Sequence, residues 1–281
     1  MTRLQTLENS SIEELLEAFN LSFSDYVVPF CLTKQQLEDK IKSDGIKLEL
    51  SAGAFEDNQL IAFVLHGYDV VGNLKVAYNA GTGVIPAKRG NKLTARLYEY
   101  VLPILHNNAI DKVLLEVITT NQPAIATYEG IGFKVIREFN CFKGAINVAA
   151  TREDFEIRAL DAYDWHMLHS FWDVKPSWQN SITAVEKLKP VTISIGLYEN
   201  EKLSGYAIFN PATRRIHQLS VDKDHRKRGA GKQLLGYIAA HYGKDFSAIN
   251  VDEASKDTLA FMTGTGMHTY IKQYEMELWL K

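Results

Sequence analysis

The sequence predicts an α+β fold, in which helices flank a mixed, mostly antiparallel central sheet, and it predicts that this fold occurs twice. Three observations support the expectation. Strands and helices follow one another in a fixed order, the second half repeats that order, and the segment joining the halves is short. We place one domain at residues 1–145 and the other at residues 146–281. Solenoid repeats are only about 20–50 residues long, so two globular domains are expected instead.

The composition is that of an ordinary globular protein. Of 281 residues, 46% are hydrophobic and 23% are charged, and the formal net charge is −3, which gives no general signal for nucleic acid. The two cysteines, Cys31 and Cys141, lack metal or redox spacing and fit free thiols in a reducing compartment. No apolar run approaches the roughly 20 residues that span a bilayer, so we expect a cytoplasmic protein with no membrane or metal partner.

Periodic apolar residues give the order of elements in the first half. A strand at residues 4–7 precedes two helices, for which either Ser10 or Ser11, and then Thr33, are possible N-caps. Strands follow at residues 48–55, 60–68 and 74–84, and the first two are joined by the polar turn 56–59. The remaining expected elements are a loop at 86–91, a helix at 93–105, an apolar strand at 112–118, a short helix from Pro123 and a strand at 133–142.

Residues of the second half correspond to residues of the first half at nearly constant sequence offsets. The segment FEDNQL at residues 55–60 corresponds to YENEKL at residues 198–203, and Arg89 corresponds to Arg226 (226 − 89 = 137). Four further pairs lie 134 residues apart (251 − 117 = 134): Val117 with Val251, Asn121 with Ser255, Gly132 with Gly266, and Phe133 with Met267. The joint falls near residues 144–154, and its shortness predicts that the halves pack together.

A turn in the second half has the features of an anion site. An alternating strand around residues 216–221 leads through charged residues to a glycine-rich turn and a helix. Free backbone N–H groups converge at a helix N-terminus and favour negative charge there, and glycine lets a phosphate approach closely. The alternative is a plain turn with solvated basic residues. The candidate binding residues are Val221, Arg226, Lys227, Arg228, Gly229, Ala230, Gly231 and Lys232.

Two motifs resemble those of a known family. RKRGAG at residues 226–231 resembles the [RQ]xxGx[GA] signature of the GNAT superfamily of acetyl-CoA-dependent N-acyltransferases. LLEVITTNQPAIATYEGIGF at residues 114–133 resembles that family's second signature, in which an Asn precedes a helix carrying a Tyr and then GF. The order of elements is also similar, so the resemblance covers nearly the whole chain twice and implies a tandem duplication of the GNAT fold.

The resemblance implies roles for particular residues. In this family the pantetheine arm of acetyl-CoA lies between two separating strands, the pyrophosphate lies on the turn, and a Tyr protonates the leaving thiolate. The position of that Tyr is Tyr128, and Asn121 precedes its helix. A backbone N–H near Val84 or Ile85 would polarise the thioester carbonyl. The cofactor-binding positions in the first half are Val84, Ile85, Arg89, Gly90, Asn91, Lys92, Leu93 and Thr94.

Neither half keeps every part of the motif. The second half has Met262, which cannot donate a proton, at the position of Tyr128. The first half has Lys92 and Thr94 where the signature expects Gly and Gly or Ala. One lost N–H hydrogen bond costs about 1–3 kcal/mol, and a non-Gly residue in the left-handed region costs about 1–2 kcal/mol. We therefore expect easier cofactor occupancy at Gly229–Gly231 and chemistry in the first half.

Each candidate residue has a structural alternative. Asn121 is a good N-cap and Tyr128 fits a packed core position. Glu116 is a candidate general base, because strand alternation places it on the face opposite Leu115 and Val117, and its alternative is a surface carboxylate.

For other strand and loop residues the sequence does not decide between a structural and a functional role. His66 and His217 lie on strands, where a single His is usually structural. The segment PSWQN at residues 176–180 fits either a pocket lining or an interface between the halves.

The function that the resemblance implies is an acyl-CoA-dependent N-acetyltransferase. It would move an acetyl group from acetyl-CoA to an amine of a small molecule or peptide by direct attack. The alternative is a catalytically silent acyl-CoA-binding or regulatory protein, and a third possibility is a structural module with a remnant site.

Overall fold

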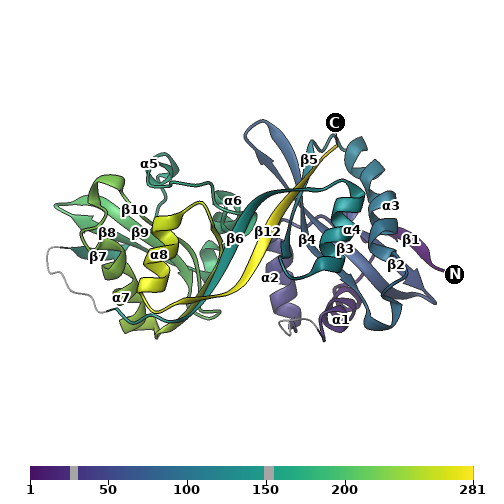
Figure 1. Cartoon of the computed structure of the whole chain (residues 1–281), viewed down its shortest axis with the longest axis horizontal. Helices are drawn as coiled ribbons and strands as arrows, with labels where there is room; N and C mark the ends of the chain where they lie inside the picture. The colour runs from purple at the N-terminus through teal and green to yellow at the C-terminus, as the bar shows by residue number, and fades with distance from the viewer. Residues whose placement is uncertain (26–30, 149–154, 281) are drawn as a thin grey trace. The chain divides into compact units, whose positions relative to one another are not determined.

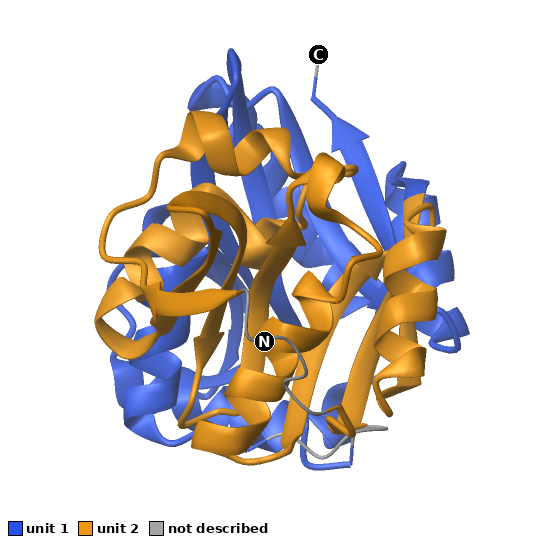
Figure 2. Cartoon of the chain, turned by 90° about the vertical axis from the view of Figure 1, so that its left-hand side faces the viewer, with its two compact units in different colours: residues 1–136, 274–281 blue, residues 137–273 orange. Residues whose placement is uncertain are grey.

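The computed structural model describes residues 1–25, 31–148 and 155–280 and divides the chain into two compact units. Unit 1 comprises Met1–Ile136 together with Tyr274–Lys281, and unit 2 comprises Arg137–Gln273 (Figure 2). Residues 149–154, which form most of the expected joint, lie outside the described residues. No helix in the described part of the chain is both long and apolar enough to cross a membrane.

Unit 1 is built around a sheet in the order β1-β2-β3-β4-β5, with the part of β12 from Tyr274 next to β5 (Figure 1). Every strand pair from β1 to β4 is antiparallel, and β4–β5 is parallel. The elements are β1 (Arg3–Thr6), α1 (Ile12–Ser22), α2 (Lys34–Asp44), β2 (Ala52–Glu56), β3 (Gln59–Val71), β4 (Leu74–Val84), α3 (Leu93–Asn107), β5 (Lys112–Ile118), α4 (Gln122–Ile131) and β12 (His268–Trp279).

Unit 2 has the same arrangement, with strand order β6-β11-β10-β9-β8-β7. Its β10–β11 pair is parallel and its β7–β8, β8–β9, β9–β10 and β6–β11 pairs are antiparallel. The elements are β6 (Lys134–Ala145), β7 (Glu156–Ala159), α5 (Trp165–Ser170), α6 (Ile182–Leu188), β8 (Ile193–Glu199), β9 (Lys202–Asn210), β10 (Arg215–Val221), α7 (Ala230–Tyr242), β11 (Asp245–Asp252) and α8 (Lys256–Gly264). The predicted α+β fold, duplicated within one chain, is confirmed.

Local sequence explains where the first helices begin. Ser11 accepts a hydrogen bond from the Glu14 amide at 3.1 Å, and the Glu14 carboxylate accepts one from the Ser11 amide at 2.9 Å. Thr33 and Gln36 form the same reciprocal pair at the start of α2. These capping boxes satisfy amides that a helix N-terminus leaves without partners. Of the two serines that the sequence allowed, Ser11 is the N-cap of α1, and Thr33 caps α2 as expected.

Each unit has its own apolar core beneath a long helix. In unit 1 the core side chains of α3 are Leu97, Tyr98, Val101 and Leu105, all fully buried. In unit 2 the corresponding residues of α7 are Leu234, Leu235 and Ile238. Spacings of three and four residues put these side chains on one face of each helix, and burying that face supplies most of the stability. The two long helices are thus held against equivalent faces of the two sheets.

The two parallel strands of each unit separate at the same point. Strands β4 and β5 are paired only from Val76↔Lys112 to Asn79↔Leu115, and β4 then continues to Val84. Strands β10 and β11 are paired only at Arg215↔Ser247 and Ile216↔Ala248. A β-bulge lies at each separation, at Ala80 in β4 and at His217 in β10, since the register passes over both residues.

Candidate functional site

The turn that leads into the long helix has the same backbone shape in both units. In unit 2, Lys227 and Gly229 are left-handed, with φ of 59° and 96°, and Gly229 is the N-cap of α7. In unit 1, Gly90 and Lys92 are left-handed, with φ of 81° and 54°, and Lys92 is the N-cap of α3. No described side chain caps either helix, so both N-termini leave backbone N–H groups directed outward. Lys92 therefore adopts the conformation that the signature glycine would adopt.

The Arg226 side chain stabilises the turn of unit 2 through hydrogen bonds to neighbouring segments. Its Nε donates to the Val221 carbonyl at 3.1 Å, its Nη2 donates to the Phe171 carbonyl at 2.6 Å, and its Nη1 meets the Asp173 carboxylate at 2.6 Å. The guanidinium thus ties the end of β10 to the chain that follows α5. Because these donors are engaged, Arg226 supports the turn and leaves the outward N–H groups to meet an anion.

Arg89 makes the same set of contacts in unit 1. Its Nε donates to the Val84 carbonyl at 3.3 Å, its Nη2 to the Ser22 carbonyl at 2.9 Å, and both Nη atoms meet the Asp25 carboxylate at 2.7 Å. This hydrogen-bonded pairing lowers the pKa of Asp25. The two arginines, predicted from the motif to bind cofactor, are both placed as supports of the turn.

A cavity of about 650 Å³ opens where β10 and β11 separate. Seven of the eight candidate residues of this half line it, and Arg228 does not. One end is formed by the turn and the start of α7, and a side wall is formed by α8, including Phe261 and Met262. The seven lining candidates are Val221, Arg226, Lys227, Gly229, Ala230, Gly231 and Lys232. The predicted cofactor-binding residues of this half thus gather around one cavity, and their binding role stays a prediction.

Gly231 is required by the close approach of α8. A Cβ atom at this position would lie 2.9 Å from the Phe261 ring, well inside normal contact distance.

Met262, beside Phe261, is 4% exposed and belongs to the apolar core. At the start of α8 the hydroxyls of Ser255 and Thr258 are hydrogen-bonded to each other at 2.8 Å. The cavity therefore has no tyrosine at the position where the resemblance expects the proton donor.

The cavity lining also contains residues that the motifs did not predict. They include Trp172, Val174, Pro176, Asn180 and Tyr206, which come from the chain between α5 and α6 and from β9. Pro176 and Asn180 belong to the PSWQN segment, so part of that segment lines a pocket. The aromatic and amide residues in this short stretch were the only sequence signal for it.

The corresponding positions in unit 1 are filled by side chains. Tyr128 is 8% exposed and makes edge-to-face contacts with Tyr98 and Phe133, at centroid distances of 6.1 Å and 5.7 Å. Tyr98 accepts a hydrogen bond at 2.8 Å from Asn79, the last residue of β4 that pairs with β5. Leu93, which stands where unit 2 has Ala230, is 4% exposed in the same core cluster. Tyr128 is therefore an integral part of the unit 1 core.

The other candidates of unit 1 lie around this core. Asn121 caps α4, because its Oδ1 accepts from the Ala124 amide at 3.3 Å. Ile85 is 6% exposed in the core cluster, and Thr94 is half-buried at the start of α3. Gly90, Asn91 and Lys92 are exposed on the turn.

Glu116 lies on β5, on the face opposite the buried Leu115 and Val117. The Tyr78 hydroxyl donates a short hydrogen bond to its carboxylate. Burial raises the pKa of Glu116 to about 8, with further increases from the charges of Glu275 and Asp44, and the bond from Tyr78 partly opposes them. A carboxyl with a pKa near neutrality suits general base catalysis. Sequence reasoning missed Tyr78 and Glu275, because nothing in the sequence links them to β5.

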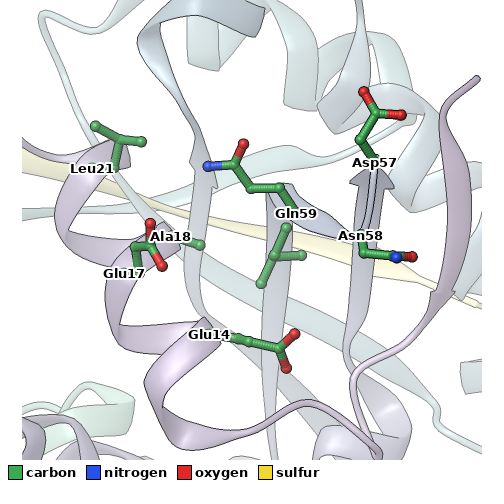
Figure 3. Close-up of a pocket in the computed structure, with 8 residues that line it drawn as sticks. Glu14, Glu17, Ala18, Leu21, Asp57, Asn58 and Gln59 are labelled. Atoms are coloured by element: carbon green, nitrogen blue, oxygen red, sulfur yellow. The ribbon is translucent and has the colours of Figure 1, made fainter.

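Unit 1 also has a cavity of about 310 Å³ between α1 and the turn joining β2 and β3 (Figure 3). It is lined by Glu14, Glu17, Ala18, Leu21, Asp57, Asn58, Gln59 and Leu60. None of the candidate residues lies there, and Glu14 is already engaged in capping α1. This cavity is therefore separate from the predicted site.

Comparison with known proteins agrees with this geometry. The model of the acetyltransferase (GNAT) family matches residues 12–133 and 155–265, one segment for each half. A tandem GNAT protein from the clavulanic acid biosynthesis pathway is similar in structure, with a TM-score of 0.74, 11% identity and coverage of 100% of this chain and 99% of that one.

Two further solved structures are similar over the whole chain. A GCN5-related N-acetyltransferase from Sphaerobacter thermophilus has a TM-score of 0.73 and 14% identity, with 100% of this chain and 96% of that chain covered. A putative acetyltransferase from Pyrococcus horikoshii has a TM-score of 0.70 and 12% identity, with 100% and 90% covered. At these identities the likeness shows the fold alone. No curated protein sequence is similar enough to match.

Proposed function

Because the chain belongs to the acetyltransferase (GNAT) family, we propose that it is an acyl-CoA-dependent N-acetyltransferase that binds acetyl-CoA in the cavity of unit 2. The acceptor is an amine of a small molecule or peptide. One observation carries the proposal: the cavity between β10 and β11 ends at the uncapped N-terminus of α7, among Gly229, Ala230 and Gly231.

The residues of this turn suit a diphosphate. The first amides of α7 have no partners within the helix, and the helix dipole adds positive potential there. The small residues at this end leave room for the backbone to approach, and Lys227 and Lys232 add charge at the cavity edge. The separated strands beyond the turn provide a slot for the thioester arm. In the reaction a neutral amine attacks the thioester carbonyl, the C–N bond forms, and the C–S bond breaks.

Hydrogen exchange with and without acetyl-CoA tests where the thioester binds. We expect slower exchange at the amides of residues 228–232 and no change at residues 91–95. Release of free thiol on adding a panel of amines then tests turnover. Protection only at residues 91–95 would contradict the proposed site. Protection at 228–232 without thiol release from any amine would favour the silent binding protein.

A second candidate places the chemistry in unit 1, and Glu116 is the observation that favours it. A carboxyl with a pKa of about 8 beside Tyr78, on the opposite sheet face from Tyr128, provides a base and a proton donor in one unit. Under this alternative Tyr128→Phe lowers thiol release at least tenfold with acetyl-CoA affinity unchanged. Under the unit 2 proposal the same variant leaves thiol release within twofold of the wild type.

A further inference from the structure

His225 lies directly before the turn that leads into α7, as the last residue of a single 3-10 turn (Lys223–His225). Its amide donates to the Asp222 carbonyl at 2.9 Å, and the Asp222 amide donates to the Ser204 carbonyl of β9 at 2.9 Å. The next residue, Arg226, lines the cavity of unit 2. The backbone around His225 therefore connects β9 to the candidate anion-binding turn.

Two carboxylates face the His225 ring. Its Nε2 lies 3.3 Å from the Glu199 carboxylate at the end of β8, and its Nδ1 lies 3.3 Å from the Asp222 carboxylate. Nδ1 has no hydrogen-bond partner among the described residues, so its contact with Asp222 is an ion pair only when the ring is charged. The side chains of His225 and Asp222 are each 15% exposed, so water screens this contact only in part. The adjacent Arg226 points elsewhere, since its guanidinium meets the Asp173 carboxylate at 2.6 Å.

One cation already lies beside these carboxylates. Lys202 Nζ, at the start of β9, is 3.4 Å from the Asp222 carboxylate, and the Lys202 side chain is 63% exposed. Burial acts to raise the pKa of Asp222, but the Asp224 amide and Lys202 outweigh it and lower that pKa, so the carboxylate is charged at neutral pH. The side chains of Lys223 and Asp224 are exposed and opposite in charge. The ring of His225 thus faces two carboxylates and one ammonium, a balance that its own protonation would make neutral.

Unit 1 has a lysine at the position of His225. Lys88 corresponds to His225 (225 − 88 = 137), at the offset that aligns the two turns. Glu56 corresponds to Glu199 (199 − 56 = 143), at the offset that aligns the two hairpins. Lys88 ends the equivalent 3-10 turn, Pro86–Lys88, and its ammonium pairs with the Glu56 carboxylate. Lysine stays charged up to about pH 10, whereas histidine gains its charge between about pH 8 and 5, so the same contact is permanent in unit 1 and depends on pH in unit 2.

We propose, resting on the proposed function, that His225 is a positioning residue whose protonation holds the unit 2 turn in the form that binds acyl-CoA. The protonated ring joins Glu199 and Asp222 and so fixes the 3-10 turn from which residues 226–229 continue into the cavity lining. A neutral ring leaves two carboxylates beside one exposed lysine, and their repulsion loosens that turn. Because the ordered turn favours the charged ring, proton binding and acyl-CoA binding support each other, and acyl-CoA affinity increases as the pH falls from 8 to 6.

Calorimetric titration of acetyl-CoA at pH 8 and pH 6 tests this dependence, with His225→Lys as the variant that is charged at both. The phosphate groups of the ligand titrate alike in every experiment, so variants are compared with one another at each pH. We expect the wild type to bind at least fivefold more weakly than His225→Lys at pH 8 and within twofold of it at pH 6. His225→Gln, which is uncharged, should bind at least fivefold more weakly than His225→Lys at both. A wild type that matches His225→Lys at both pH values, or a His225→Lys variant as weak as His225→Gln, overturns the inference.

Amide exchange of the ligand-free protein separates this inference from the proposed function. Relative to His225→Lys at the same pH, the wild type should show at least fivefold lower protection of residues 226–229 at pH 8 and equal protection at pH 6. The converse variant, Lys88→His, should make the protection of residues 89–92 depend on pH and leave acetyl-CoA affinity unchanged. If acetyl-CoA binds no variant at either pH, the proposed function fails, and the exchange comparison still decides whether His225 positions the turn. Equal protection in the wild type and His225→Lys at pH 8 contradicts that role.

Discussion

The two units share one scaffold and differ in what fills the space between their parallel strands. Both keep an arginine-fastened turn with two left-handed residues and an uncapped helix. Unit 2 has Ala230 and Gly231 at the start of its helix and a cavity beyond them. Unit 1 has Leu93 and Thr94 there, with Tyr128 packed against Tyr98. The backbone of the turn is therefore maintained in both copies, whereas side-chain volume decides where a ligand has room.

The largest expected effect concerns whether the two units are independent. Leu97 in α3 and Leu234 in α7 occupy equivalent positions and are both fully buried. Each Leu→Ala change should lower the free energy of unfolding by about 3 kcal/mol, because apolar burial is lost and a cavity is left behind. Amide exchange should locate the loss in unit 1 for Leu97→Ala and in unit 2 for Leu234→Ala. Val191→Ala, at a site 45% exposed, is the control. Equal loosening of both units by either core variant would show one cooperative unit.

The next effect concerns which turn binds the thioester. Gly231→Leu brings a side chain against Phe261, where a Cβ alone would lie at 2.9 Å, and into the cavity. We expect acetyl-CoA affinity to fall at least 100-fold, about 3 kcal/mol, by calorimetry. The control Gly264→Ala adds a methyl group into open space and should change nothing. If Thr94→Leu abolishes binding and Gly231→Leu does not, the ligand belongs to unit 1.

The paired arginines give a smaller difference. Arg226→Met and Arg89→Met each remove hydrogen bonds to a carboxylate and to backbone carbonyls, so each should lower the free energy of unfolding by about 1–2 kcal/mol. Only Arg226→Met should weaken acetyl-CoA binding, by about tenfold, because it loosens the turn that lines the cavity. The measurement is calorimetry alongside denaturant unfolding. Equal effects of both variants on affinity would remove the distinction between the turns.

The smallest effect is a contrast in pH dependence. The pKa of Glu116 is raised from 4.5 to about 8 by burial, so folded unit 1 binds more protons than the unfolded chain across this range, and stability falls as the pH rises. Lys256 and Asn140 lower the pKa of Glu253 in unit 2 from 4.5 to about 2, so its contribution is lost as the pH falls below 4.5. Denaturant unfolding of Glu116→Gln should show a flatter profile between pH 4.5 and 8. If the free energy of unfolding of this variant depends on pH as in the wild type, groups other than Glu116 cause the dependence.

Much of the fold was predictable because it depends on local patterns. The expected strand at residues 74–84 is β4 (Leu74–Val84), Ser11 is the N-cap of α1 out of the two candidates Ser10 and Ser11, and Thr33 caps α2 as expected. The expected strand at residues 48–55 was partly wrong. Leu48–Leu50 form a 3-10 turn in which the Leu48 carbonyl accepts from both the Leu7 amide and the Ser51 amide, and the strand begins at Ala52. Apolar alternation does not reveal such a turn, because the turn is fixed by contacts with a distant segment.

The candidate site was predictable only in part, for a related reason. The turn residues 226–232 follow from a short motif, and all of them except Arg228 line a cavity. The part of the lining that includes Trp172 and Pro176 comes from the chain between two helices, and no motif marks it. His217 is a single histidine on a strand in the sequence. Its place at the bulge, and the lack of a hydrogen-bond partner for its Nδ1 among the described residues, are properties of the packed sheet.

The sequence by itself determined that the chain carries two copies of one fold, because offsets of 134–143 residues align their motifs in order. Only the tertiary structure decided which strands belong to which unit. Residues from Arg137 onward in β6 belong to unit 2, and the end of β12 from Tyr274 belongs to unit 1. The physical reason is that main-chain hydrogen bonds are the same for any partner strand of suitable length. A strand's own pattern therefore predicts that it pairs, and the packing of whole sheets selects the partner.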